Sequence, residues 1–203
     1  EFMAAMPHYE RNTVETARMA VAARQHLFAW AKEAGIDFDL KKEGILHIYR
    51  DKSGFEHAGR VSKLLAQGGL PRRAVTPDEM KAIEPTLAGQ YYGGYFTESD
   101  STGDIHSFTT GLAAAAQRLG VKILYGQDVQ AVRSDGQQAW VTAAADAGER
   151  EVHSFDSLVV CAGVASRDLA AQLGDRVNIY PVKGYSITVN LNDAQSQAGA
   201  PNV

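Results

Sequence analysis

The stretch from Leu158 to Gly163 contains the residue types that most directly suggest a ligand site. Its continuous apolar pattern is typical of a strand buried on both faces, and that strand runs into Ala162-Gly163. Small residues at such a turn let the backbone approach a ligand closely, and a helix expected over 165–173 would offer free N–H groups. The pattern suits a phosphate or dinucleotide edge, but taken alone it favours the simpler interpretation, a buried strand that ends in a glycine turn.

Other chemistries find little support in the sequence. Cys161 is the only cysteine, so neither a disulfide framework nor a cysteine zinc site can form within one chain, and we interpret it as a packing residue. The six histidines show no paired spacing near carboxylates, which argues against a metal site. Asp104 most simply caps a helix, and Arg72-Arg73 is interpreted as a solvated charge pair.

The size and charge of the chain narrow its class. Its 203 residues are enough for one ordinary domain or two small ones. The formal net charge of −4 gives no overall basic field that would attract nucleic acid. No stretch approaches the roughly 20 apolar residues that a membrane-spanning helix needs, so no transmembrane segment is expected.

The first half of the chain predicts helices and short strands. Asn12, with Glu15 three residues later, predicts the start of a long helix that ends at Gly35. Thr76-Pro77 with Glu79 is a complete capping-box pattern. Helices are therefore expected over 12–34, 54–67, 77–84 and 104–119, and strands over 36–40, 45–49 and 91–97.

From Val121 the apolar period changes to two, which is typical of strands. A first strand is expected over 121–125 and a three-stranded meander over 129–132, 139–143 and 151–153. The apolar strand 157–161, the helix 165–173 and a last strand region over 177–191 complete the prediction.

Several segments resemble, in order and spacing, the FAD-dependent D-amino-acid oxidase family, and in particular its bacterial dehydrogenase branch. The meander followed by a strand ending in Ala-Gly resembles the middle of two-dinucleotide-binding flavoproteins. The remaining similar segments are Met80 to Leu87, Gly93 to Phe96, Ser101 to Asp104 and Pro181 to Ser186. The resemblance extends from about Asn12 to Leu191.

The resemblance implies an α+β fold with two intertwined parts. Residues 1–105 plus 176–203 would form a substrate or cap domain built on an antiparallel sheet. Residues 106–175 would form the middle part of a FAD-binding domain of the two-dinucleotide-binding type. In that domain the backbone of Val129 would contact the adenine, and the Ala162-Gly163 turn would lie near the FAD.

The resemblance also implies a reaction, in which a hydride passes from the α-carbon of a D-amino acid to the flavin. The imino acid then hydrolyses to a 2-oxo acid and ammonia, and a quinone is the expected type of electron acceptor. Lys183 could bind the substrate carboxylate or be a solvated lysine, and Tyr185 could line the substrate pocket or pack in the core. No catalytic residue is assigned, and the expected location is the cytoplasm, at most peripheral to the inner membrane.

The sequence contains no Gly-x-Gly-x-x-Gly turn for the pyrophosphate, and the C-terminal part of the family pattern is absent. We therefore expect a central fragment that neither binds FAD tightly nor turns over substrate by itself. Two alternatives are open: a relative of glycine or sarcosine oxidase, and a non-catalytic scaffold domain with the same fold.

Overall fold

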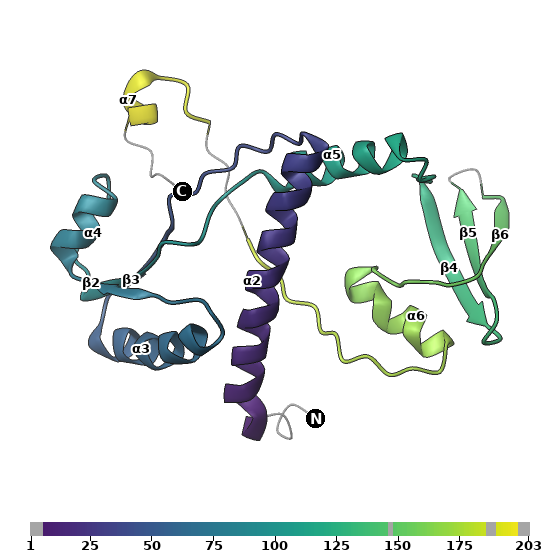
Figure 1. Ribbon diagram of the computed structural model, residues 1–203, viewed down its shortest axis with the longest axis horizontal. Helices are drawn as coiled ribbons and strands as arrows, with labels where there is room; N and C mark the ends of the chain where they lie inside the picture. The colour runs from purple at the N-terminus through teal and green to yellow at the C-terminus, as the bar shows by residue number, and fades with distance from the viewer. Residues whose placement is uncertain (1–5, 146–147, 186–189, 199–203) are drawn as a thin grey trace. The chain divides into compact units, whose positions relative to one another are not determined.

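The computed structural model describes residues 6–145, 148–185 and 190–198, which form helices and antiparallel strands (Figure 1), as the α+β expectation requires. The chain divides into two compact units, Glu1–Val121 with Asn190–Val203, and Lys122–Val189. The helical elements are η1 (Met6–His8), α2 (Tyr9–Ala34), α3 (Lys52–Gln67), α4 (Pro77–Ile83), α5 (Ile105–Arg118), η2 (Gly163–Ala165), α6 (Ser166–Gln172) and α7 (Ala194–Ala198). The strands are β1 (Ile45–Tyr49), β2 (Arg73–Val75), β3 (Gly93–Thr97), β4 (Gln127–Ser134), β5 (Ala139–Ala145) and β6 (Arg150–Phe155).

The first unit is built on an antiparallel sheet in which β3 lies between β1 and β2. Helices α3 and α4 cover its opposite faces (Figure 1). On the α3 face, the ring of Phe55 stacks on Tyr95 with 4.9 Å between centroids. On the α4 face, the fully buried Met80 lies against Gly94, where an added Cβ would be 3.1 Å from its sulfur. The glycines of β3 therefore let both helices pack closely on the sheet.

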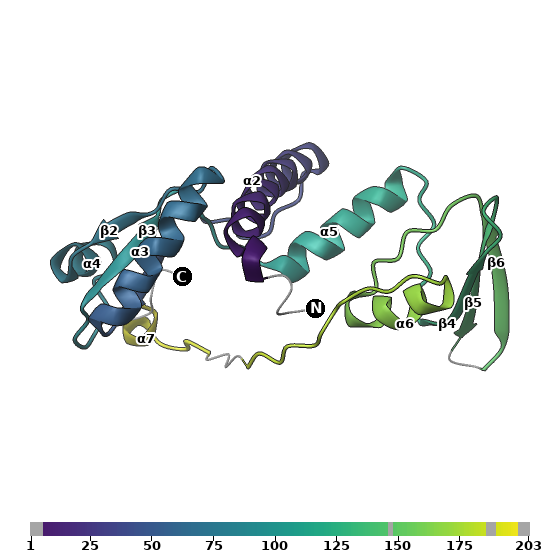
Figure 2. The ribbon, with the colours of Figure 1, turned by 90° about the horizontal axis from the view of Figure 1, so that it is seen from below.

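A second cluster of the first unit forms between α2 and α5, which are adjacent in Figure 2. The Phe38 and Phe108 rings meet edge to face at 5.3 Å, and Ala31 of α2 is buried beside them. This packing explains why 36–40 forms no strand, contrary to expectation. The Ile36 N–H donates to the Ala31 carbonyl at the helix end, and Asp39 has a φ of +52°, which interrupts an extended backbone.

The helix limits agree with the sequence signals at most ends of the first unit, with one clear exception. Thr76 and Glu79 form the complete capping box at α4, and Gly35 ends α2 in the left-handed conformation. Asn12, by contrast, lies inside α2 and does not cap it, because η1 leads directly into the helix at Tyr9. Glu15 pairs instead with Arg18 at 2.6 Å, one turn further along.

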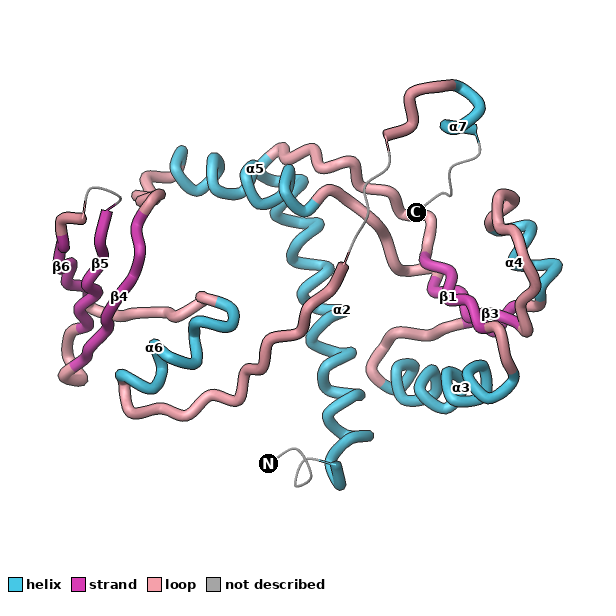
Figure 3. The backbone as a smooth tube through the Cα atoms, turned by 180° about the vertical axis from the view of Figure 1, so that it is seen from behind, coloured by secondary structure: helices cyan, strands magenta, loops and turns pink. Residues whose placement is uncertain are grey.

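The second unit is built on the expected antiparallel meander, with β5 between β4 and β6. Figure 3 shows the three strands and helix α6. The end of α6 is joined to the sheet because Gln172 accepts a hydrogen bond from the Val132 N–H, at 2.9 Å. Its buried apolar residues are small: Val132, Ala139, Ala143 and Ala170.

Three predicted strands are wrong where the structure describes them. Residues 121–125 and 157–161 form no strand, and neither do the described parts of 177–191; residues 186–189 lie outside the described residues. Figure 3 draws the described parts as loop. These segments have the apolar residues of strands, but a strand is stable only when a neighbour pairs with its N–H and C=O groups. No described strand pairs with them.

Helix α5 packs with the first unit, which therefore continues to Val121. The predicted substrate part (1–105 plus 176–203) and flavin part (106–175) are defined by the ligand that each would bind, not by compactness. This division stays a prediction.

Candidate functional site

The five residues predicted to surround the flavin and substrate all belong to the second unit. Val129 lies on β4, where the pairing with β5 shifts by one residue between Val129 and Ala131. Such a bulge leaves a residue outside the regular ladder and turns the strand locally. Val129 is 41% exposed and still pairs with Ala143, so Gln130 is the residue that the bulge leaves without a partner in the ladder.

The Ala162-Gly163 turn has a backbone geometry that suits a glycine. Gly163 has a φ of +55°, and an added Cβ would meet nothing within 4 Å. The Ala162 N–H donates to the Ser166 hydroxyl at 3.0 Å, which ties the turn to the first turn of α6. The same α6 bonds β4 through Gln172 at its other end. The turn thus combines a left-handed conformation with an unobstructed face.

The segment before this turn differs from its expected buried strand. Val159 is 83% exposed, and Cys161 is exposed as well. The interpretation of Cys161 as a packing residue is therefore wrong for this chain. The physical reason is the missing strand pairing: without neighbours on either side, the segment has no sheet layer in which to bury its apolar side chains.

Lys183 and Tyr185 lie near each other in an extended segment. The Lys183 ammonium is 5.5 Å from the centre of the Tyr185 ring, within the range of a cation–π contact. Tyr185 is 87% exposed, so it does not pack in a core within the described residues. Ser186, the last residue of the family-like segment, lies outside the described residues. The roles of Lys183 and Tyr185 in substrate binding stay predictions.

Asp104 caps α5, as its position before the helix predicts. Its carboxylate accepts hydrogen bonds from the backbone N–H groups of His106 and Ser107 and from the Ser107 hydroxyl. These bonds lower the pKa of Asp104 because they stabilise the charged carboxylate, and the bond from the Ser107 hydroxyl has the largest effect. The group is therefore a structural cap that is ionised at neutral pH.

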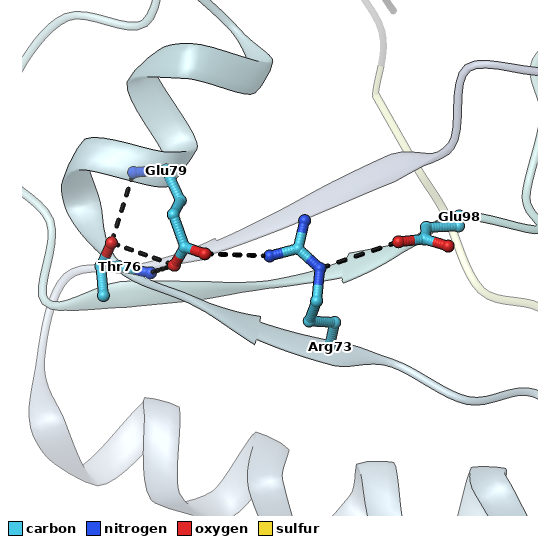
Figure 4. Close-up of polar contacts among 4 residues, drawn as sticks. All are labelled: Arg73, Thr76, Glu79 and Glu98. Atoms are coloured by element: carbon cyan, nitrogen blue, oxygen red, sulfur yellow. Dashed lines mark hydrogen bonds and ion pairs between the residues drawn. The ribbon is translucent and has the colours of Figure 1, made fainter.

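The two adjacent arginines, Arg72 and Arg73, are not the solvated charge pair that the sequence predicted. Arg73 is not simply solvated: it lies between Glu79 at 3.2 Å and Glu98 at 3.7 Å (Figure 4). Its guanidinium carbon also lies 5.8 Å from the centre of the Phe96 ring. Arg72 points elsewhere, and its Nε is buried without a hydrogen-bond partner. The period-two alternation of β2 was the one signal in the sequence that could have separated them.

The Ala162-Gly163 turn has a backbone geometry that would suit one flank of a flavin nucleotide. A glycine with an open face allows the backbone to approach a flat ring or a phosphate closely. The 203-residue sequence contains no Gly-x-Gly-x-x-Gly turn of the kind that binds a dinucleotide pyrophosphate.

The described residues contain neither a cluster of metal ligands nor a helix that could cross a membrane. Across 6–145, 148–185 and 190–198, no group of three or more His, Cys, Asp or Glu residues is placed to hold a metal ion. Within the same ranges, no helix combines the length and the apolar character required to cross a membrane.

Comparison with known proteins identifies relatives along nearly the whole chain. Residues 3–203 match the family described as FAD dependent oxidoreductase. D-amino acid dehydrogenase 3 of Mesorhizobium japonicum is 49% identical over 99% of this chain and 48% of its own length. D-amino acid dehydrogenase of Paramagnetospirillum magneticum is 41% identical over 96% of this chain and 45% of its own length. The chain thus spans about half the length of these relatives.

Solved structures show the same fold at lower identity. Glycine oxidase from Geobacillus kaustophilus is 21% identical, with a TM-score of 0.62, over 78% of this chain and 41% of its own chain. L-proline dehydrogenase from P. horikoshii is 19% identical, with a TM-score of 0.60, over 80% of this chain and 40% of its own. Together with the family match over residues 3–203, these similarities establish that the chain belongs to the FAD-dependent oxidoreductase family.

Proposed function

We propose that this chain is the central portion of a FAD-dependent dehydrogenase that oxidatively deaminates D-amino acids to 2-oxo acids and ammonia. The observation that carries the proposal is the 49% identity, over 99% of the chain, to a protein named D-amino acid dehydrogenase 3. The glycine oxidase structure is only 21% identical and therefore supports the fold, without favouring glycine or sarcosine as substrate.

The flavin would supply the acceptor for the hydride that leaves the substrate α-carbon, and water would then hydrolyse the imino acid. The chain's own residues would hold and orient the reactants. The Gly163 turn would let the backbone lie against the flavin, and the backbone at Val129 would contact its adenine end. The Lys183 ammonium is suited to bind a substrate carboxylate, and the Tyr185 ring to form an apolar wall beside it.

The substrate class can be tested with the full-length protein. D-alanine and sarcosine should be offered in turn, each with oxygen and with a soluble quinone as electron acceptor. We expect turnover of D-alanine with the quinone and formation of pyruvate and ammonia in equal amounts. A clear preference for sarcosine with oxygen would support the oxidase alternative, and a protein without flavin would support the scaffold alternative.

The position of the flavin can be tested with two matched glycine substitutions. Gly163→Ala and Gly136→Ala both place a Cβ at a positive φ, in each case with nothing within 4 Å. The backbone strain should therefore be similar, on the order of 1–2 kcal/mol. We expect Gly163→Ala alone to lower the flavin content and kcat/KM of the full-length protein. Equal flavin content in the two variants would contradict the assignment of Gly163.

The role of Lys183 can be separated from that of a surface lysine by its kinetics. If the ammonium binds the substrate carboxylate, Lys183→Met should raise KM for the D-amino acid while the flavin spectrum stays unchanged. An unchanged KM would assign Lys183 to the surface.

The behaviour of the chain alone, the electron acceptor and the cellular location are further parts of the proposal. We propose that the 203-residue chain does not bind FAD tightly, because its sequence lacks the pyrophosphate-binding turn. A stoichiometric flavin absorption spectrum of the purified chain would contradict this. A quinone acceptor, and a cytoplasmic position at most peripheral to the inner membrane, are proposed on family resemblance.

A further inference from the structure

Two consecutive arginines of the first unit have different surroundings. The Arg73 guanidinium is held by Glu79 and Glu98 on the α4 face of the sheet (Figure 4). None of the ion pairs among the described residues includes Arg72, and its Nε is buried without a partner. Arg72 as a whole is partly exposed, but a buried guanidinium nitrogen without a partner is still costly, because a charged group loses hydration on burial.

The strand register places Arg72 on the α3 face of the sheet. Arg73 pairs with Phe96 and faces α4, so the preceding residue turns to the opposite face, beside Thr97. His47 pairs with Tyr95 and is therefore a diagonal neighbour of Thr97 on the same face. The pKa of His47 is lowered by burial and, second, by the charge of Arg72, against the opposing effect of Asp100. This electrostatic effect agrees with the placement of Arg72 near His47.

Helix α3 brings a fourth polar group to this region. Phe55 lies over Gly93, and Gly59 lies beneath the Tyr95 hydroxyl, so α3 advances along β3 in the direction of Thr97. Ser62 is one turn further along the same stripe of the helix. It is 7% exposed and Thr97 is 0% exposed, so both hydroxyls are inside the unit.

Each of these four residues has one buried side-chain atom without a hydrogen-bond partner. The atoms His47 Nε2, Ser62 Oγ, Arg72 Nε and Thr97 Oγ1 are each buried and have no hydrogen-bond partner. All four can donate: the guanidinium is an obligatory donor, and the two hydroxyls and a neutral imidazole can each offer a hydrogen. The nearby carboxylate of Asp100 is already paired with Arg24 at 2.7 Å. None of the four atoms has an acceptor among the described residues, and an oxyanion would offer several.

We propose that Arg72, Thr97, Ser62 and His47 form a binding site for a small oxyanion between helix α3 and the sheet of β1, β2 and β3. A carboxylate or a phosphate presents several acceptor oxygens that match the fork of a guanidinium and the two hydroxyls. The ligand would neutralise Arg72 and satisfy the orphaned donors at the same time. These four residues belong to the first unit, whereas the residues proposed to contact the flavin belong to the second.

The test measures the thermal stability of the purified chain while sodium formate, and separately sodium phosphate, is added. A ligand that binds only the folded state raises the melting temperature, by a few degrees when the site is well saturated. We expect this rise in the wild type and in Arg73→Gln, because Arg73 already has carboxylate partners in the chain. We expect no rise in Arg72→Gln. The response to formate compared with phosphate reports which oxyanion fits the site.

Two further variants distinguish a loss of anion binding from a loss of folding in Arg72→Gln. Arg72→Lys keeps the charge but loses the fork, and Thr97→Val keeps the shape but removes one hydroxyl; each should weaken the anion response several-fold. The Nε–Hε resonance of Arg72 should shift on titration in a nitrogen–proton NMR spectrum, while that of Arg73 stays in place. An equal rise in all variants, or no shift of the Arg72 resonance, would overturn the proposal.

Discussion

The two units of the chain differ in how their apolar residues are used. The first unit buries large side chains within itself: Met80 is fully buried between α4 and the sheet, and Phe38, Tyr95 and Phe108 are buried as well. Among the described residues of the second unit, the buried apolar residues are one valine and three alanines, whereas Phe155, Val159 and Tyr185 are exposed. The difference shows that a correct secondary-structure pattern does not by itself provide a core; the pattern also needs a layer to pack against.

Hydrogen exchange should give the largest contrast between the units. The amides of β3 are central in a three-stranded sheet, whereas Leu158, Val159 and Val160 belong to no ladder. We expect amide exchange at 158–160 to be more than about a hundredfold faster than in β3, because little free energy is needed to expose these amides to water. Mass spectrometry of peptic fragments would measure this. Equal protection of both segments would contradict the difference between the units.

A pair of matched truncations tests the same contrast by stability. Met80→Ala removes a fully buried side chain of the first unit and should lower the free energy of unfolding by about 2–5 kcal/mol. Val159→Ala changes an exposed side chain of the second unit and should stay within about 0.5 kcal/mol. Urea denaturation followed by circular dichroism measures both. A large loss for Val159→Ala would mean that the segment packs in solution.

The link between α6 and β4 offers a smaller effect inside the second unit. Gln172→Leu removes the acceptor of the Val132 N–H and leaves that donor unsatisfied, at a cost of about 1–3 kcal/mol. The control Gln137→Leu changes a glutamine in the β4–β5 turn of the same unit and should have little effect. Equal stability of the two variants would show that the Gln172 contact does not hold α6 on the sheet.

The sequence predicted the local elements better than the sheet pairings. The capping box at Thr76 and Glu79, the α5 cap at Asp104 and the meander could be predicted because their signals lie within a few neighbouring residues. The strands expected at 121–125 and 157–161 depended on long-range partners that no local pattern reports. The candidate Val129 could be named only by family resemblance, whereas the residues of the Ala162-Gly163 turn suggested a ligand site by themselves. The orphaned Arg72 emerged only from the register of β2.

The smallest expected effect concerns acid stability of the first unit. The pKa of Glu79 is lowered mainly by the Thr76 N–H, then by the Thr76 hydroxyl and the charge of Arg73. A lowered pKa in the folded state means that this stabilisation is present above the ordinary value of 4.5 and is lost as the pH falls below it.

Glu79→Gln should therefore make unfolding slightly less dependent on pH below about 4.5. Urea midpoints measured between neutral and acidic pH would show the effect. The double variant Thr76→Ala/Glu79→Gln should have the same acid dependence as Glu79→Gln alone. Parallel pH profiles for the wild type and Glu79→Gln would contradict the role of this carboxylate.

The exposure of Cys161 has a practical consequence for spectroscopy. Because it is the chain's only thiol and is exposed, a maleimide dye would attach at a single position without any engineered substitution. That position directly precedes Ala162-Gly163, so the emission of the dye would be quenched if an isoalloxazine ring lies beside the turn. A dye on Cys161 would therefore report, without any substitution, whether a flavin ring binds beside the Ala162-Gly163 turn.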